Sequence, residues 1–368
     1  MFLFERLFGI TCYLAVLAFA FITIFYRKLK VKDVLLFYIV VLSVFAFFYE
    51  PYETADLFRI RNIMKQFSMY DFESFFHSFL KSSTTPVAYL LYWIVGKSGV
   101  PGLLPAFTAA VTYSSVFYIL YKSAKIYSIG NKSIAIILLF VMSTGNYIMV
   151  ISNIRTMLAI SLICFCFFRE SILKSFRIWH ILLYVLAALT HNLAIILIII
   201  RFIVFVFLSQ LKRKWKIIII SFLAIVSVFV VMFFGWVMDS VFEKAVGYIT
   251  GDTYFYIWEY IIAIIAIIIE NKICVMFRRK QDMRAKETAV YLFVCMIVAC
   301  VFITQFSIFH RIITYIAPIL AIPLLASSGS NLTRSTGKRF VSIFYLSLVM
   351  LAIACFRGSL SSLKFFVL

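Results

Sequence analysis

The sequence predicts an all-α, polytopic membrane protein, and three observations support that prediction. The chain of 368 residues is 64% hydrophobic with a mean hydropathy of +1.06, whereas ordinary globular domains contain about 45–50% apolar residues. The apolar residues form almost unbroken runs, for example at 195–200 and 261–269, unlike the alternating segments of a membrane β-barrel. Clusters of lysine and arginine separate the longer runs, as expected where membrane helices end on the cytoplasmic side.

These basic clusters allow the spans to be assigned in chain order. The first apolar run ends at Arg27, Lys28, Lys30 and Lys32, so we expect that end to be cytoplasmic and the N-terminus to lie outside. The run is long enough to remain as a span, so we expect no cleavable signal peptide. A straight span needs roughly 20 residues, and the chain is expected to form about twelve transmembrane helices in a single transmembrane domain, residues 1–368. Most of them are expected at residues 7–26, 33–50, 101–121, 133–150, 153–168, 217–237, 257–271, 288–306, 312–327 and 340–356.

Two further helices are expected in the apolar run from residue 179 to 208, which is basic at both ends. Arg169, Lys174 and Arg177 precede this run, and the basic segment 212–216 follows it. If both ends are cytoplasmic, the chain must cross the membrane twice in about 30 residues, although one straight span already needs roughly 20. The pattern therefore predicts a hairpin of two short helices with His191 at its turn, near the outer face.

Two longer segments are expected outside the membrane. The first, residues 51–100, contains a stretch at 72–79 with phenylalanines at helical spacing, which predicts an amphipathic helix in the headgroup region. Residues 86–95 are apolar but too short for an ordinary span, so we expect a re-entrant or interfacial segment. The second outer loop, residues 238–256, is rich in aromatic residues; an interface belt explains them better than a sugar-stacking surface.

Charge and motif content exclude several function classes. The formal net charge is +20, but most basic residues fall in the predicted cytoplasmic segments, where they set orientation and contact anionic lipids. We therefore expect no nucleic-acid partner. The seven cysteines lie in or beside apolar runs without a CxxC pair, which predicts packing roles rather than metal or redox chemistry. No P-loop, GxGxxG, HExxH or GxSxG pattern occurs, so ATP-driven transport, dinucleotide chemistry, zinc proteolysis and lipase-type chemistry have no support.

Arginines near the predicted outer ends of helices are the first candidates for function, because the orientation of the chain in the membrane requires basic residues only at the cytoplasmic ends. Arg155 and Arg311 begin two predicted helices, and Arg201 lies deeper in its own. Such charges are costly and usually face a cavity or a partner, and the guanidinium fork suits phosphate oxygens. The alternative is that the arginines, including Arg59 and Arg61 of the first outer loop, pair with acidic residues or snorkel. We favour function for Arg155 and Arg311 together.

Imidazole and carboxylate groups are the second set of candidates. His191 is a candidate general base, because a neutral imidazole can take a proton from an attacking hydroxyl near neutral pH. His310 has weaker support, since it equally suits an interface residue. Glu50, Glu53 and Asp56 are spaced three apart and would share one helical face. We expect them to supply a base or to pair with arginines rather than to bind a metal, and no D-x-D motif occurs.

At these residues the chain resembles the EpsG-like branch of the Wzy-type polysaccharide polymerases. The resemblance covers nearly the whole chain in the family's order, although an expected Gly-x-Asp in the first loop reads Thr54–Ala55–Asp56 here. The matching pieces are the acidic first outer loop with Asp56, the stretch NIRTMLAISL with Asn153 and Arg155, the stretch ALTHNLAII around His191, and the stretch HRIITY with Arg311 and Tyr315.

The resemblance implies a specific reaction. Such proteins join O-antigen, capsule or exopolysaccharide repeat units on the periplasmic or exterior side of the bacterial inner membrane. The growing glycan on undecaprenyl pyrophosphate is the donor, and a new lipid-linked repeat unit supplies the acceptor hydroxyl. The implied fold is GT-C-like, and the implied glycosyltransferase uses no nucleotide sugar, cofactor or metal ion. A flippase and a chain-length regulator are the implied protein partners.

The same reaction gives each candidate residue an expected role. Catalysis is expected to involve His191, Asp56, Arg155 and Arg311. Pyrophosphate binding is expected at Arg155, Arg311, Arg59 and Arg61. Acceptor or sugar binding is expected at Asn153, Glu53, His310 and Tyr315. Two rival functions remain: an O-antigen ligase, which usually has a larger late outer loop, and a flippase, which should show related halves or charges along a path through both leaflets.

Overall fold

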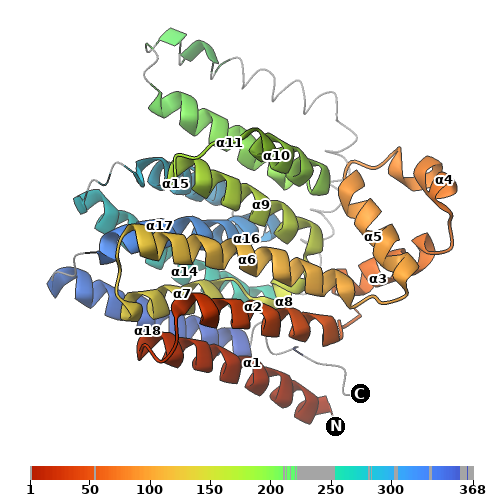
Figure 1. Ribbon diagram of the computed structural model, residues 1–368, viewed down its shortest axis with the longest axis horizontal. Helices are drawn as coiled ribbons and strands as arrows, with labels where there is room; N and C mark the ends of the chain where they lie inside the picture. The colour runs from red at the N-terminus through yellow and green to blue at the C-terminus, as the bar shows by residue number, and fades with distance from the viewer. Residues whose placement is uncertain are drawn as a thin grey trace.

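The computed structural model describes residues 2–53, 55–209, 253–280, 284–301, 306–330 and 334–356, with short pieces at 212, 214–215, 217–219, 221, 282 and 363. Among these residues no strand occurs, and the helices lie side by side as one bundle (Figure 1). The elements are α1 (Phe2–Phe25), α2 (Val31–Phe48), α3 (Asp56–Phe67), α4 (Phe72–Phe75), the π-helical turn η1 (Phe76–Leu80), α5 (Pro86–Ser98), α6 (Leu103–Ile126), α7 (Asn131–Thr144), α8 (Tyr147–Ser152), α9 (Ile154–Ser171), α10 (Ile178–Thr190), α11 (Leu193–Leu208), α14 (Thr253–Lys280), α15 (Lys286–Val301), α16 (Phe306–Arg311), the π-helical turn η2 (Ile312–Ile316), α17 (Ala317–Gly329) and α18 (Arg334–Phe356).

The length and apolar character of these helices are those of a multi-pass membrane protein. Within the described residues, five helices are long and apolar enough to span a bilayer, and three more apolar helices are shorter. The all-α class predicted from the sequence is therefore confirmed, whereas the count of about twelve crossings and the GT-C-like arrangement stay predictions. The five long helices are Leu7–Phe25, Val31–Phe48, Leu103–Ile126, Phe309–Gly329 and Gly337–Phe356.

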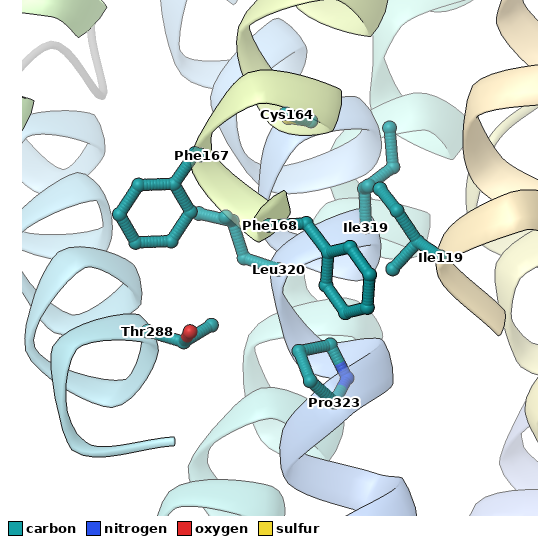
Figure 2. A pocket seen from close by; sticks show the side chains of 8 residues that line it. All are labelled: Ile119, Cys164, Phe167, Phe168, Thr288, Ile319, Leu320 and Pro323. Carbon is teal, nitrogen blue, oxygen red and sulfur yellow. The ribbon is translucent and has the colours of Figure 1, made fainter. Parts of the chain in front are cut away.

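The continuous helix formed by the end of α16, η2 and α17 is the core of the bundle. Its apolar stretch is completely buried, because α6, α7, α14 and α15 all pack against α17. Pro323 lies inside α17 and has no N–H to donate to the preceding turn. Figure 2 shows the small cavity beside it, about 10 Å³ in volume and lined mainly by apolar side chains. This cavity has room for no more than one water molecule, so it is a packing defect and not a substrate site.

At one end of the bundle, α3, α4, η1 and α5 form a small helical unit, here called the α3–α5 end (Figure 1). Aromatic rings fill its centre: Phe75 stacks on Trp93 at 5.6 Å and meets Phe67 edge-on at 5.1 Å between ring centroids. Gly96 lets α5 approach α3, since a Cβ there would lie 2.5 Å from the carbonyl oxygen of Met64. The α3–α5 end is thus a packed structure and not an open loop.

The predicted amphipathic segment 72–79 is helical, as α4 and η1. Asp71 caps it by accepting a hydrogen bond of 2.9 Å from the backbone N–H of Ser74. Phe75 is buried, whereas Phe72 and Phe76 are exposed. Exposed rings on one face are expected for a helix that lies at a membrane interface. The location of this helix in the headgroup region stays a prediction.

The predicted single span 133–150 is wrong in one respect: the helix breaks before its end. α7 ends at Thr144, Gly145 donates its N–H to the carbonyl oxygen of Val141 at 2.9 Å, and the side chain of Asn146 caps α8 by accepting from Ile148 N at 3.1 Å. A second break follows at Asn153, before α9. Asparagine side chains compete for backbone hydrogen bonds and can interrupt a helix. A prediction from the number of apolar residues does not take this competition into account.

The predicted hairpin around His191 is confirmed as a pair of helices, α10 and α11, with His191 and Asn192 between them. The second outer loop, 238–256, lies largely outside the described residues, as does most of the span 217–237. Residues 253–256, expected in that loop, belong to the first turn of α14.

Candidate functional site

The break between α8 and α9 is the centre of the candidate site. Ser152 and Asn153 are 5% and 8% exposed, respectively, and the break is only one residue wide, because Asn153 N donates to Met149 O and Asn153 O accepts from Met157 N. The break thus brings polar side chains into a buried region. Arg155, in the first turn of α9, is the charged residue that accompanies them.

Arg155 and Asp56 approach the same buried hydroxyl group, that of Tyr92 on α5. Burial raises the pKa of Tyr92; the positive charge of Arg155 opposes that rise, and the negative charge of Asp56 adds to it. The Tyr92 hydroxyl has no hydrogen-bond partner among the described residues. Two residues that are 99 positions apart in the chain, and were both predicted as catalytic, therefore lie within electrostatic reach of one polar atom.

The two arginines of α3 are each engaged by the protein. Arg59 forms an exposed ion pair with Asp56, which is the pairing alternative considered from the sequence. Arg61 donates from Nη2 to the carbonyl oxygen of Tyr49 at 2.8 Å. Burial lowers the pKa of Arg61, and Glu50 opposes that change. Glu53, expected to contact sugar, is an exposed residue in the turn before α3.

A second polar group lies beside Arg311 in the chain, where α16 ends and η2 begins. His310 and Glu259 are 1% and 4% exposed, and His310 Nε2 lies 3.1 Å from Glu259 Oε2. Thr314 Oγ1 donates to the carbonyl oxygen of His310 at 2.7 Å and lies 3.4 Å from its Nδ1. Both ring nitrogens of His310 thus face protein oxygens. His310 thereby links α16 to α14, and its expected contact with sugar stays a prediction.

Tyr315 and Asn153 connect the two groups. Asn153, Glu259 and Arg311 all lie close enough to the Tyr315 side chain to influence it electrostatically, although the Tyr315 hydroxyl has no hydrogen-bond partner among the described residues. α9 also contacts η2 directly. Tyr315 also lines a cavity of about 20 Å³ with Tyr113, next to the α7–α8 break at Gly145. The structure therefore brings Arg155, Asn153, Arg311 and Tyr315 into one region.

His191 lies at the turn between α10 and α11, and its ring is partly exposed. Its Nδ1 accepts a hydrogen bond of 3.0 Å from the backbone N–H of Leu193. α10 packs against α5, which carries Tyr92, and against α9, which carries Arg155. This packing puts the hairpin beside the elements that form the candidate site.

Sequence reasoning missed two members of the site and included one residue that lies elsewhere. Tyr92 gave no signal in the sequence, but Glu259 did: an ionisable residue within an apolar run is a functional candidate by itself. Arg201, counted among the outward-facing arginines, instead pairs with Glu170 at 3.6 Å and with Glu287 at 3.9 Å. Glu170 lies 15 residues beyond Arg155 on α9, or about 22 Å along a helix that rises 1.5 Å per residue.

Replacing Glu259 by alanine is expected to destabilise the protein by about 1–3 kcal/mol, because His310 would keep a buried nitrogen without its partner. Glu259→Gln should cost less, since the amide oxygen can still accept from Nε2. Thermal unfolding in detergent measures the stability of both variants.

Glu270 is the control: it lies on the same helix, is fully buried, and neither of its carboxyl oxygens has a hydrogen-bond partner among the described residues. Glu270→Gln should therefore not destabilise the fold, and equal losses for the two glutamine variants would contradict the role given to the Glu259–His310 pair.

Fold and site together define a class: a helical membrane protein in which partly buried arginines lie near buried tyrosines and carboxyl groups at helix breaks, close to the α3–α5 end. The chain matches the EpsG family over residues 34–366 and belongs to that family, which is a family of Wzy-like polysaccharide polymerases. No curated protein and no solved structure matches it significantly.

Proposed function

We propose that this protein is a glycosyltransferase that joins lipid-linked oligosaccharide repeat units at the outer face of the bacterial inner membrane. The acceptor sugar hydroxyl attacks the anomeric carbon of the donor glycan. The bond from that carbon to undecaprenyl pyrophosphate breaks, and the hydroxyl proton passes to a base. Charge develops on the leaving pyrophosphate, and stabilising such charge is often the largest single contribution to catalysis.

The observation that supports the proposal is that α9, which carries Asn153 and Arg155, contacts η2, and that Asn153 and Arg311 both lie near Tyr315. Two guanidinium groups that are partly exposed in one polar region can bind the oxygens of a pyrophosphate with several charge-assisted hydrogen bonds. Arg59 and Arg61 lie on α3 at the α3–α5 end and would extend this positive region toward the membrane surface. Prenyl chains would enter between helices near the exposed rings of Phe72 and Phe76.

Asp56 is the carboxylate that fits the role of base. Its side chain is partly exposed, it shares Tyr92 with Arg155, and its ion pair with Arg59 lies at the surface, where such pairs exchange readily with water. His191, at the turn between α10 and α11, is the second candidate for a contact with the substrate. Asn153 and Tyr315 would contact sugar hydroxyls, since amide and phenol groups both donate and accept hydrogen bonds.

Purified protein in lipid nanodiscs, supplied with lipid-linked repeat units only, is expected to produce a ladder of products without ATP or an ion gradient. A ligase would transfer a glycan once to a different acceptor lipid and give no ladder. A flippase would move the substrate across a vesicle membrane without changing its length. Either of these results would contradict the polymerase assignment, and gel separation of the released glycans distinguishes all three.

A further inference from the structure

His191 is held by three local hydrogen bonds. Its backbone N–H donates to the carbonyl oxygen of Ala187 at 3.0 Å, and its own carbonyl oxygen accepts from Ala194 N at 2.9 Å. In addition, Leu193 N donates to Nδ1 of the ring at 3.0 Å. The backbone on both sides and one ring nitrogen therefore have defined partners, and the ring has a defined orientation at the start of α11.

The hydrogen bond from Leu193 determines which nitrogen carries the proton. A backbone N–H can only donate, so Nδ1 must present its lone pair to it and cannot carry a hydrogen. In the neutral imidazole the proton then resides on Nε2. A base accepts a proton at a lone pair, and in this tautomer the lone pair belongs to Nδ1 and points at the helix backbone. Protonating Nδ1 would break the hydrogen bond that begins α11.

We propose that His191 acts as a neutral hydrogen-bond donor, through Nε2–H, to an oxygen of the lipid-linked pyrophosphate, and not as the general base. The inference rests on the proposed function, which supplies that substrate. It reverses the role expected from the sequence, where an imidazole near the arginines suggested proton abstraction. Asp56 then remains as the group that takes the acceptor proton.

The position of His191 suits a donor to the leaving group. α10 packs against α5 and α9, the two helices that carry Tyr92 and Arg155, and the ring is partly exposed between the buried residues Thr190 and Leu193. A donor whose orientation is already set costs no reorganisation as charge develops. Removing one such donor typically reduces kcat by about 10²–10³-fold. Because the donor is neutral, it adds a directed hydrogen bond without adding another positive charge to the two arginines of the site.

Two isosteric substitutions separate a donor from a base. In His191→Gln, the amide nitrogen reaches the position of Nε2 and can still donate, but the cap on Leu193 N–H is lost. In His191→Asn, the shorter side chain can keep the cap through Oδ1, as asparagine does at helix starts, but nothing reaches the position of Nε2. We expect His191→Gln to retain polymerisation within about 10-fold of the wild type and His191→Asn to lose about 10²-fold or more.

The order of stability should be the opposite of the order of activity. Losing a cap costs about 1 kcal/mol, so His191→Gln should melt at a lower temperature than His191→Asn. A purely structural role would make His191→Asn the more active variant, and a base would make both variants equally inactive. Either outcome overturns the proposal.

A second measurement does not depend on activity. The protein has four histidines, so the difference between the nitrogen spectra of ¹⁵N-histidine-labelled wild type and His191→Asn isolates the ring of residue 191. We expect a protonated Nε2 and a bare Nδ1; the opposite tautomer would overturn the proposal by itself. If the wild type makes no ladder while the spectra show the expected tautomer, the failure lies in the proposed polymerase function and not in the geometry of His191.

Discussion

Replacing Arg155 by lysine is expected to reduce polymer formation by about 10²–10³-fold, the usual loss when a preorganised group that stabilises transition-state charge is removed. Lysine keeps the positive charge but lacks the planar fork of donors that binds two phosphate oxygens at once. The loss should appear mainly in kcat, since the charge on the pyrophosphate grows as the glycosidic bond breaks. The nanodisc assay with lipid-linked repeat units measures it.

Arg169→Lys is the matched control for this experiment. Arg169 lies on the same helix in its last turn, and its guanidinium packs over the rings of Phe165 and Trp179 at 5.8 and 5.3 Å from the ring centroids. This variant should keep near-normal activity because its residue is remote from the α8–α9 break. Normal polymer length from Arg155→Lys, or equal losses from both variants, would remove Arg155 from the site.

Replacing Arg201 by alanine should have the largest effect on stability, up to about 3 kcal/mol, because it removes the cationic partner of the partly buried Glu170, whereas Glu287 still pairs with Lys174 at 3.6 Å. Arg201 pairs with Glu170 and Glu287, and its guanidinium also lies over the ring of Phe167 at 5.0 Å from the centroid. Tyr184 on α10 donates to Glu170 at 3.1 Å. The network therefore ties α9, α10, α11 and α15 together.

Unfolding of the Arg201 variant can be followed with a thiol-reactive dye, since Cys164, Cys166 and Cys295 are buried in the folded protein. The double variant Arg201→Ala with Glu170→Gln should recover part of the loss, because removing both partners is less costly than removing one. If the two single losses simply add, the residues do not interact, and the network does not stabilise the bundle.

Much of the architecture could be predicted from the sequence, because lipid imposes strict local rules. The apolar runs determine an all-helical membrane chain, since every backbone group in the bilayer must be satisfied within its own helix. The hairpin at His191 follows from basic residues at both ends of a run too short for two ordinary spans. Arg155 and Arg311 stand out because charges at helix ends are costly without a partner.

Only the tertiary structure decided which polar groups meet. The partners of the site are distant in the chain: Glu259 and His310 are 51 residues apart, and Asp56 and Arg155 share Tyr92 across nearly one hundred residues. Hydrophobic periodicity shows that a helix is buried but not which helix it faces. For the same reason the sequence placed Arg201 among the outward-facing arginines, and only its contacts with Glu170 and Glu287 show that it lies toward the other end of α9.

The sequence by itself determined the class of fold and the charged residues that required an explanation. The packing of α9, η2 and α14 decided their partners, because side-chain hydrogen bonds and ion pairs depend on distances of a few ångströms between helices that the chain order leaves open.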